Sequence, residues 1–259
     1  MPQGRQLFVS DLHLDATAPD AVTQFRRFLE DEASHSAGLY ILGDLFETWI
    51  GDDDNEAVRG EICDALHRLT GSGTPCWIMR GNRDFLLGEQ FERRSGCELL
   101  PDPVLLQIGS LRAVLCHGDL LCTADHGYQQ FRTLSRSAAF QSAYLRLPLT
   151  TRRALAHMAR ASSHEHTRRM RSDIMDVDET AVAAALRCGD SDLLIHGHTH
   201  RPGIHRHMVD GRSATRIVLG DWYDQGSCLV LEADGRYELL TLPRGGASTL
   251  SMESSSARV

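Results

Sequence analysis

The sequence predicts an α/β fold in which strands alternate with helices around one core. Short apolar runs with the length of a buried strand recur along the chain, and helix-like stretches separate the early ones. Asp11 and Asp44, which follow the first two runs, lie 33 positions apart, about the length of one βαβ unit. With 42% apolar residues among 259, the chain can bury a substantial core.

The individual elements follow from these runs in chain order. Because strands and helices alternate at the start, parallel βαβ units are the most economical arrangement. We expect one domain over 1–243, followed by a Gly- and Ser-rich, disordered tail over 244–259. The predicted strands are 6–10, 39–42, 76–79, 113–116, 193–195, 217–219 and 228–231, and the predicted early helices are 21–33 and 55–69.

Composition argues against several classes of protein. The net charge of -8 disfavours general nucleic-acid binding, and no apolar run reaches the roughly 18 residues of a membrane-spanning helix. The first residues lack the charged and apolar parts of a signal peptide. Seven cysteines without a C-x-x-C pair are expected to be reduced thiols of a cytosolic protein.

One segment is locally cationic in this acidic chain. Residues 125 to 172 contain nine arginines and only two acidic residues, and the whole sequence has no lysine. This favours an anionic partner or a membrane surface at the segment. For the absence of lysine, genome composition is the favoured explanation.

Five of the predicted strands end in side chains that can bind a metal ion. In α/β sheets the carboxyl ends of the strands converge on one crevice, so these side chains are expected to meet. Oxygen and nitrogen donors without a thiolate suit manganese, iron or zinc, and two ions that share one carboxylate would explain the large set. The candidate ligands are Asp11, His13, Asp44, Asn82, His117, His198 and His200.

The spacing of two pairs supports this interpretation. Residues i and i+2 of an extended segment point to the same side. Asp11 and His13 are therefore expected to reach one ion together, and His198 and His200 to face the site with one histidine for each ion. D-x-H, G-D-x-x-E and G-N-x-D are weak alone and H-G-H-T-H is a stronger signal, and all of them in this order indicate a metal centre.

Taken together, D-x-H, G-D, G-N, H-G-D and G-H-x-H resemble the calcineurin-like metallophosphoesterase superfamily. Within this superfamily, longer stretches resemble the UDP-2,3-diacylglucosamine pyrophosphohydrolase family of lipid A biosynthesis. This resemblance covers about residues 7–243. The resemblance implies a β-sandwich flanked by helices, with an inserted helical lid over about 125–172. The stretches are YILGDLFETWIGDDD (40–54), GNRDFLLG (81–88), HGDLLCTADHGYQQFR (117–132), IMDV (174–177) and IHGHTHRP (195–202).

The resemblance also implies a ligand set and a reaction. Water activated by two divalent ions, with manganese favoured, would attack the phosphorus next to uridine in UDP-2,3-diacylglucosamine. The products would be UMP and 2,3-diacylglucosamine 1-phosphate (lipid X). One ion would be held by Asp11, His13, Asp44 and His200, and the other by Asp44, Asn82, His117 and His198, with Asp44 bridging.

Arg83 stands where most superfamily members have histidine. An arginine cannot act as an acid, but it can bind phosphate oxygens bidentately and offset developing charge. Cleavage of a diphosphate expels a good leaving group that needs little protonation, so arginine in place of histidine at this position fits a diphosphate substrate. Asn82, Arg83 and His198 are thus the expected catalytic residues.

The lid is expected to receive the acyl chains and to carry arginines toward phosphates or anionic lipid. Pro148 would divide it into two helix-like halves, and the enzyme would lie peripherally on the cytoplasmic face of the inner membrane. An ordinary amphipathic helical pair is the alternative. The family implies substrate contacts at Asp125, Ser163, Thr167 and Met170, beside Asn82, Arg83 and His198. The family commonly has lysine at the Met170 position, so Arg169 or Arg171 would have to replace it.

Two other functions stay open at this point. One is a dinuclear phosphodiesterase acting on another nucleotide or nucleotide sugar, and the other is a non-catalytic scaffold that binds proteins. No obligate protein partner and no nucleic-acid partner is indicated. The acids of 47–54, together with Asp84 and Asp119, are expected to support the ligands or to be solvated, and His196 to close its strand.

Overall fold

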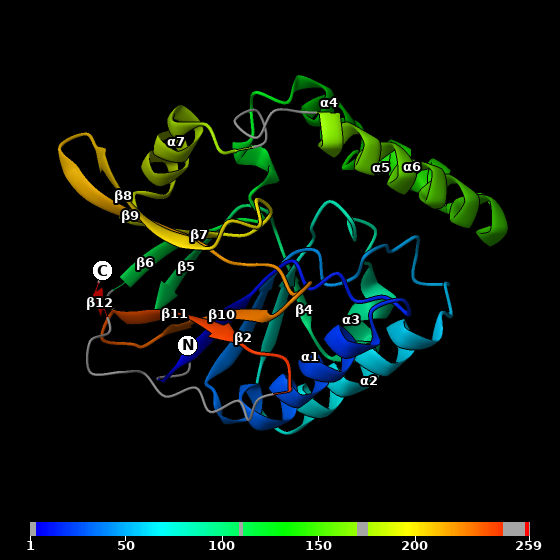
Figure 1. The fold of residues 1–259 in the computed structure, drawn as a ribbon, viewed down its shortest axis with the longest axis horizontal. Helices are drawn as coiled ribbons and strands as arrows, with labels where there is room; N and C mark the ends of the chain where they lie inside the picture. Colours follow the sequence, from blue (N-terminus) through cyan, green and yellow to red (C-terminus); the bar gives the residue numbers. More distant parts are fainter. Residues whose placement is uncertain (1–3, 109–110, 170–175, 246–256, 259) are drawn as a thin grey trace.

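Two β-sheets pack face to face and carry helices on both outer sides (Figure 1). The structure is a computed structural model that describes residues 4–108, 111–169, 176–245 and 257–258, without the side chains of 162–169 and 257–258. The larger sheet has the order β12-β11-β10-β1-β2-β3-β4 and the smaller one β5-β6-β7-β9-β8. The strands are β1 Gln6–Val9, β2 Gly38–Leu42, β3 Cys76–Met79, β4 Glu98–Leu100, β5 Val104–Ile108, β6 Leu111–Leu115, β7 Leu193–His196, β8 Gly203–Val209, β9 Arg212–Val218, β10 Gly226–Leu231, β11 Arg236–Leu242 and β12 Ala257–Arg258.

Both sheets are mixed, so the expectation of parallel units holds for only part of each. Strands β1 to β4 are parallel neighbours, as are β6, β7 and β9. Strands β10 and β11 join the larger sheet antiparallel, and β5 and β8 are antiparallel edges of the smaller one. All residues of β1 and β2 are buried, which is typical of strands covered on both faces.

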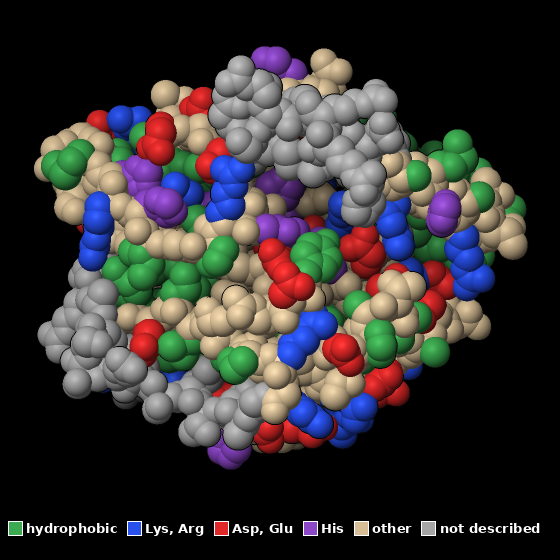
Figure 2. All heavy atoms as spheres, viewed as in Figure 1, with side chains coloured by type: hydrophobic (Ala, Val, Ile, Leu, Met, Phe, Trp, Pro, Cys, Tyr) green, Lys and Arg blue, Asp and Glu red, His purple; other side chains and the backbone are tan. Residues whose placement is uncertain are grey.

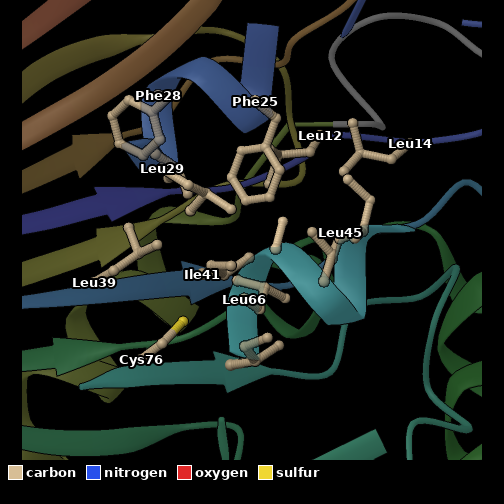
Figure 3. Packing of buried hydrophobic residues seen from close by; sticks show 14 of the residues in the cluster. Leu12, Leu14, Phe25, Phe28, Leu29, Leu39, Ile41, Leu45, Leu66 and Cys76 are labelled. Atoms are coloured by element: carbon tan, nitrogen blue, oxygen red, sulfur yellow. The ribbon is translucent and has the colours of Figure 1, made fainter. Parts of the chain in front are cut away.

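The helices cover the outer faces of the two sheets (Figure 1). Helix α1 starts with Pro19 at its first turn and buries Ala21, Val22, Phe25, Phe28 and Leu29, spaced to form one apolar stripe. This stripe and α2 pack on β1 and β2, as Figure 3 shows for several of these residues. The helices are α1 Pro19–Asp31, α2 Ala57–Gly71, α3 Glu89–Ser95, α4 His126–Ser135, α5 Ala138–Leu145, α6 Leu149–Arg169 and α7 Glu179–Gly189.

The core between the sheets is apolar and partly aromatic. Phe8 stacks on Tyr40 with ring centroids 4.8 Å apart, and Tyr40 stacks on Trp77 at 4.6 Å. Across the interface, residues of the smaller sheet such as Leu115 and Ile195 belong to the same buried cluster. A separate cluster packs α7 on the outer face of the smaller sheet. The packed core thus keeps the strand ends that carry the candidate ligands in fixed positions.

Helices α4, α5 and α6 form an arm outside the sandwich (Figure 1). The sequence predicted two helical halves, but the first half is itself divided, because Ser137 caps a new helix by accepting a hydrogen bond from the backbone of Phe140. Pro148 directly precedes α6, as its effect on a helix start predicts. None of the helices in the described ranges could cross a bilayer.

Ala257 and Arg258 pair with β11, so the disordered tail that we expected over 244–259 ends in a short strand. Arg244, at the start of that region, donates hydrogen bonds to the carbonyls of Trp222 and Tyr223. Residues 246–256 and 259 lie outside the described part of the chain.

Candidate metal centre and adjoining cavity

All seven predicted ligands lie together at the ends of five strands. The first group consists of Asp11, His13, His200 and one oxygen of Asp44. Asp11 Oδ1 lies 3.4 Å from His200 Nε2 and 4.0 Å from His13 Nε2. The two histidine Nε2 atoms are 3.3 Å apart, and Asp44 Oδ2 is 3.9 Å from His13 Nε2. Figure 2 shows histidine side chains beside acidic ones in the middle of this face.

The second group consists of Asn82, His117, His198 and the other oxygen of Asp44. Asn82 Oδ1 is 2.9 Å from His117 Nε2 and 3.1 Å from His198 Nδ1. Asp44 Oδ1 is 3.8 Å from His117 Nε2. Asp44 therefore offers one carboxylate oxygen to each group, which is the geometry of a bridging ligand.

These donors fit divalent cations. Asp11 and Asp44 are buried, and Asp11 Oδ1 has no hydrogen-bond partner although it is shielded from solvent. Buried carboxylates need positive charge nearby, and an unpartnered buried oxygen is costly. Burial alone would lower the pKa of His117, but the carboxylates of Asp44, Asp119 and Asp11 raise it to about 9. The site thus favours cationic charge, and its N and O donors suit manganese, iron or zinc.

The backbone holds five of these side chains in a left-handed conformation. The φ angles are 52° at Asp11, 50° at His13, 53° at Asp44, 68° at His198 and 54° at His200. Such conformations cost roughly 1–2 kcal/mol each for a residue with a Cβ. The pairs thus reach the site through strained turns, and our expectation of extended segments at these ligands was wrong.

Neighbouring groups fix the orientation of the donors. The Ser10 hydroxyl and the His198 backbone N–H both donate to Asp11 Oδ2, at 2.6 and 2.8 Å, which leaves Oδ1 for the centre. His117 Nδ1 donates to the Leu42 carbonyl at 2.9 Å, which directs its Nε2 toward the centre, 2.9 Å from Asn82 Oδ1. Such partners set the tautomer and direction of ligating histidines.

Two carboxylates contact Nδ1 of His13 and of His200 and orient these rings in the same way. Glu47 lies 3.1 Å from His13 Nδ1, and Asp221 lies 3.4 Å from His200 Nδ1. The sequence did not single out Asp221, because it follows an apolar run that carries none of the recognised motifs. His196 ends β7, where it is buried and donates from Nδ1 to the Gly197 carbonyl at 2.8 Å. Burial lowers its pKa to about 3, so it stays neutral.

Asp84 has a structural role that its sequence context did not reveal. It is fully buried and accepts hydrogen bonds from the backbone N–H groups of Gly81 and Leu45, at 2.7 and 2.8 Å. It therefore ties the turn that carries Asn82 to the turn that carries Asp44. Burial and the nearby Asp44 raise the pKa of Asp84 to about 6.

A large apolar cavity opens beside the second ligand group. Its volume is about 880 Å³, and it lies between the arm and the loops after β2 and β3. Asn82 and Arg83 line it next to the centre, and the Arg83 backbone N–H donates to Asp44 Oδ1 at 2.8 Å. Its apolar lining includes Trp49, Ile50, Phe85, Leu86, Phe131, Phe140, Tyr144, Leu147 and Leu155.

Of the six arm arginines whose side chains are described, five pair with acids of the core, and this corrects the expectation that they face phosphates or lipid. Arg132 contacts Asp102 at 2.8 Å and Asp119 at 3.0 Å. Buried Arg152 pairs with Asp53. Three further pairs join Arg136 to Asp119 at 3.4 Å, Arg153 to Asp54 at 2.6 Å and Arg160 to Glu47 at 3.6 Å.

The predicted lid contacts to substrate have different outcomes. Asp125 caps α4, because its side chain accepts a hydrogen bond from the Tyr128 backbone at 2.9 Å. It does not line the cavity, whereas Gly127 and Tyr128 do. Ser163 and Thr167 belong to α6, but the structure does not describe their side chains. Met170 and Arg171 lie entirely outside the described residues.

Comparison with known proteins agrees with this architecture. Residues 4–202 match the calcineurin-like phosphoesterase family. The UDP-2,3-diacylglucosamine hydrolase of Aeromonas hydrophila is 49% identical over 86% of this chain and 93% of its own length. The protein of the same name from Stenotrophomonas maltophilia is 48% identical over 92% of this chain and 98% of its own. The chain therefore belongs to the calcineurin-like phosphoesterase family, within the group that these hydrolases represent.

Proposed function

We propose that this protein hydrolyses the diphosphate of UDP-2,3-diacylglucosamine to UMP and 2,3-diacylglucosamine 1-phosphate, a step of lipid A biosynthesis. The observation that carries the proposal is the continuity between the metal centre and the apolar cavity. Asn82 belongs to the second ligand group and also lines the cavity, next to Arg83. A substrate with a diphosphate and fatty acyl chains needs these two environments side by side. The names of the relatives support the same substrate.

In this proposal two manganese ions occupy the two ligand groups. Asp11, His13, Asp44 and His200 hold one ion, and Asp44, Asn82, His117 and His198 hold the other. Such an ion pair polarises phosphoryl oxygens and activates water when it is bound. The two Asp44 oxygens, which face separate ligand groups, support a pair over a single ion.

Arg83 supplies the positive charge for the phosphate that leaves. Its guanidinium can bind two phosphate oxygens, and its position next to Asn82 puts it at the mouth of the cavity. The leaving phosphate monoester needs no proton from a side chain, so a permanently charged group is suitable there. His198 and Asn82 position the phosphate at the second ligand group.

The cavity receives the two acyl chains, and α4 to α6 act as an inserted lid on a single domain. Its volume of about 880 Å³ lies toward the upper end of the roughly 300–1,000 Å³ of ligand pockets. Residues of all three arm helices contribute to its apolar lining. The resemblance places Asp125, Ser163, Thr167 and the region of Met170 among the substrate contacts, and we keep these as proposals.

The outer surface of the arm fits peripheral contact with the cytoplasmic face of the inner membrane. Large apolar side chains are exposed there, which is costly in water and favourable at a lipid surface. The arrangement would let an insoluble substrate pass from the bilayer into the cavity. The exposed residues of the arm that do not line the cavity are Leu134, Leu145 and Met158.

One assay tests the proposal and separates it from its alternatives. Purified protein with manganese is given UDP-2,3-diacylglucosamine, and products are identified by mass spectrometry. We expect UMP and the diacylated sugar phosphate, and much slower turnover of UDP-glucosamine, which lacks acyl chains. Equal turnover of both would favour a phosphodiesterase for soluble nucleotide sugars. Absence of any manganese-dependent hydrolysis would favour a non-catalytic scaffold.

A further inference from the structure

A second hollow opens on the His13 side of the metal centre. Its volume is about 250 Å³, and none of its lining residues lines the large cavity. The small hollow includes His13 of the first ligand group, whereas the large cavity includes Asn82 of the second. Each space is therefore bordered by a residue of a different ligand group. The lining consists of Leu12, His13, Thr17, Ala18, Pro19, Asp20, Ala21, Trp222, Tyr223 and Arg244.

The substrate has the same linear order. Its acyl chains are at one end, its diphosphate is in the middle and its uridine is at the other end. With the chains in the large cavity and the diphosphate at the two ligand groups, the uridine leaves the centre on the His13 side. We propose that the small hollow is the nucleoside subsite and that Tyr223 stacks on the uracil ring. This inference rests on the proposed function.

The environment of Tyr223 supports this role. Its ring is parallel to the His13 imidazole, with centroids 5.0 Å apart and planes 6° apart, so it lies directly beside the first ligand group. It is nevertheless 50% exposed. An aromatic surface that is open to solvent at the edge of a phosphate site suits a nucleobase, because every base has a face that stacks.

The turn that carries Tyr223 is held rigidly. Trp222 is fully buried and packs edge-on against Phe25 and Phe28, with centroids 5.8 and 5.5 Å apart. Arg244 donates to the Trp222 carbonyl at 2.8 Å and also to the Tyr223 carbonyl. The backbone that carries the Tyr223 ring is thus held in place before a ligand binds, which lowers the entropic cost of stacking.

The polar lining is suited to the edges of a nucleoside. The Asp20 carboxylate can accept hydrogen bonds from ribose hydroxyls or from the uracil N3–H, and Thr17 can add a hydroxyl. Arg244 Nε is shielded from solvent and has no hydrogen-bond partner among the described residues, so it can donate to a uracil carbonyl. The small volume favours a single-ring base over a purine.

The test measures how much the base contributes to binding. Calorimetry in manganese compares UMP with ribose 5-phosphate, which keeps the phosphate and the sugar but lacks the base. We expect UMP to bind about tenfold more tightly, the size of one stacked base, and AMP to bind more weakly than UMP. The ratio should persist in Tyr223→Phe and fall close to one in Tyr223→Ala. Met208→Ala, a truncation of an exposed side chain on β8 that lines neither hollow, is the control and should keep the ratio.

An unchanged UMP preference in a folded Tyr223→Ala variant would overturn the subsite, as would equal binding of UMP and ribose 5-phosphate by the unaltered protein. Thermal melting checks folding, and Tyr223→Phe gives a second measurement with the ring in place. Hydrolysis of UDP-2,3-diacylglucosamine is assayed separately. Failure of the proposed function would thus be seen as absent turnover, and failure of the subsite as an unaltered binding ratio.

Discussion

Gly81 offers a sharp test of whether the position of Asp44 controls the metal centre. A Cβ atom at residue 81 would lie 2.8 Å from Asp44 Cγ and would also collide with the Asp44 carboxylate oxygen and backbone N. Separations under 3.0 Å are essentially never seen for real Cβ atoms. Because one colliding atom belongs to the backbone, rotation of the Asp44 side chain cannot relieve the overlap.

Gly81→Ala must therefore move the bridging carboxylate, the adjoining turn, or both. Overpacking of this kind costs about 1–3 kcal/mol of stability. Displacement of a catalytic group by about 1 Å can cost roughly a hundredfold in rate. We expect kcat/KM for the diphosphate substrate to fall about a hundredfold, with fewer than two manganese ions bound per protein.

The assay combines steady-state kinetics, metal content by mass spectrometry and thermal melting. Gly71→Ala is the matched control, since no described atom lies within 4 Å of a Cβ at the end of α2. That variant should keep full activity and become slightly more stable, by about 0.4–1 kcal/mol. If Gly81→Ala kept its metal content and its kcat/KM within twofold, the position of Asp44 would not control metal binding or activity.

Three further results are expected. Removal of metal by a chelator should lower the melting temperature and abolish hydrolysis, because buried Asp11 and Asp44 would lack cations, and added manganese should restore both. An unchanged melting curve would contradict this. Arg152→Met should raise KM several-fold at constant metal content, since it removes the ion pair to Asp53 that ties α6 to the core; equal KM values would refute that role. A thiol reagent should label one cysteine in the native protein and seven after denaturation, because only Cys188 is exposed; prompt labelling of more would show that the core opens.

The ligands were predictable because topology forces them together. The candidate ligands follow short buried strands. The carboxyl ends of β1, β2 and β3 share one edge of the larger sheet, and those of β6 and β7 share one edge of the smaller sheet. The face-to-face packing of the two sheets brings these two edges together. Their backbone conformation was not predictable, since nothing in D-x-H or H-x-H indicates a left-handed residue at each ligand. Asp84 was expected either to support the ligands or to be solvated. The sequence could not decide between these roles, because an Asp near Gly and Asn is an ordinary turn residue until its two buried backbone partners are known.

Long-range charge pairing was the second feature that the sequence could not reveal. Arg152 and Asp53 are 99 positions apart, and local composition indicates only that one segment is basic and another acidic. Their pairing changes the meaning of the arginine-rich segment, whose charges bind the arm to the core. Tyr223 was missed because it lies beyond the last recognised motif, and only the fold brings it beside His13.

The two sides of the site are held by different forces, and this has a consequence for substrate entry. The ligands stand on strands fixed by the apolar core between the sheets, which is insensitive to salt. The arm is attached through ion pairs, of which Arg153 with Asp54 is partly exposed and Arg152 with Asp53 reaches solvent on the Asp53 side. Exposed pairs weaken as ionic strength rises, whereas apolar burial does not. We therefore expect the arm, rather than the metal centre, to yield when the acyl chains of the proposed substrate enter.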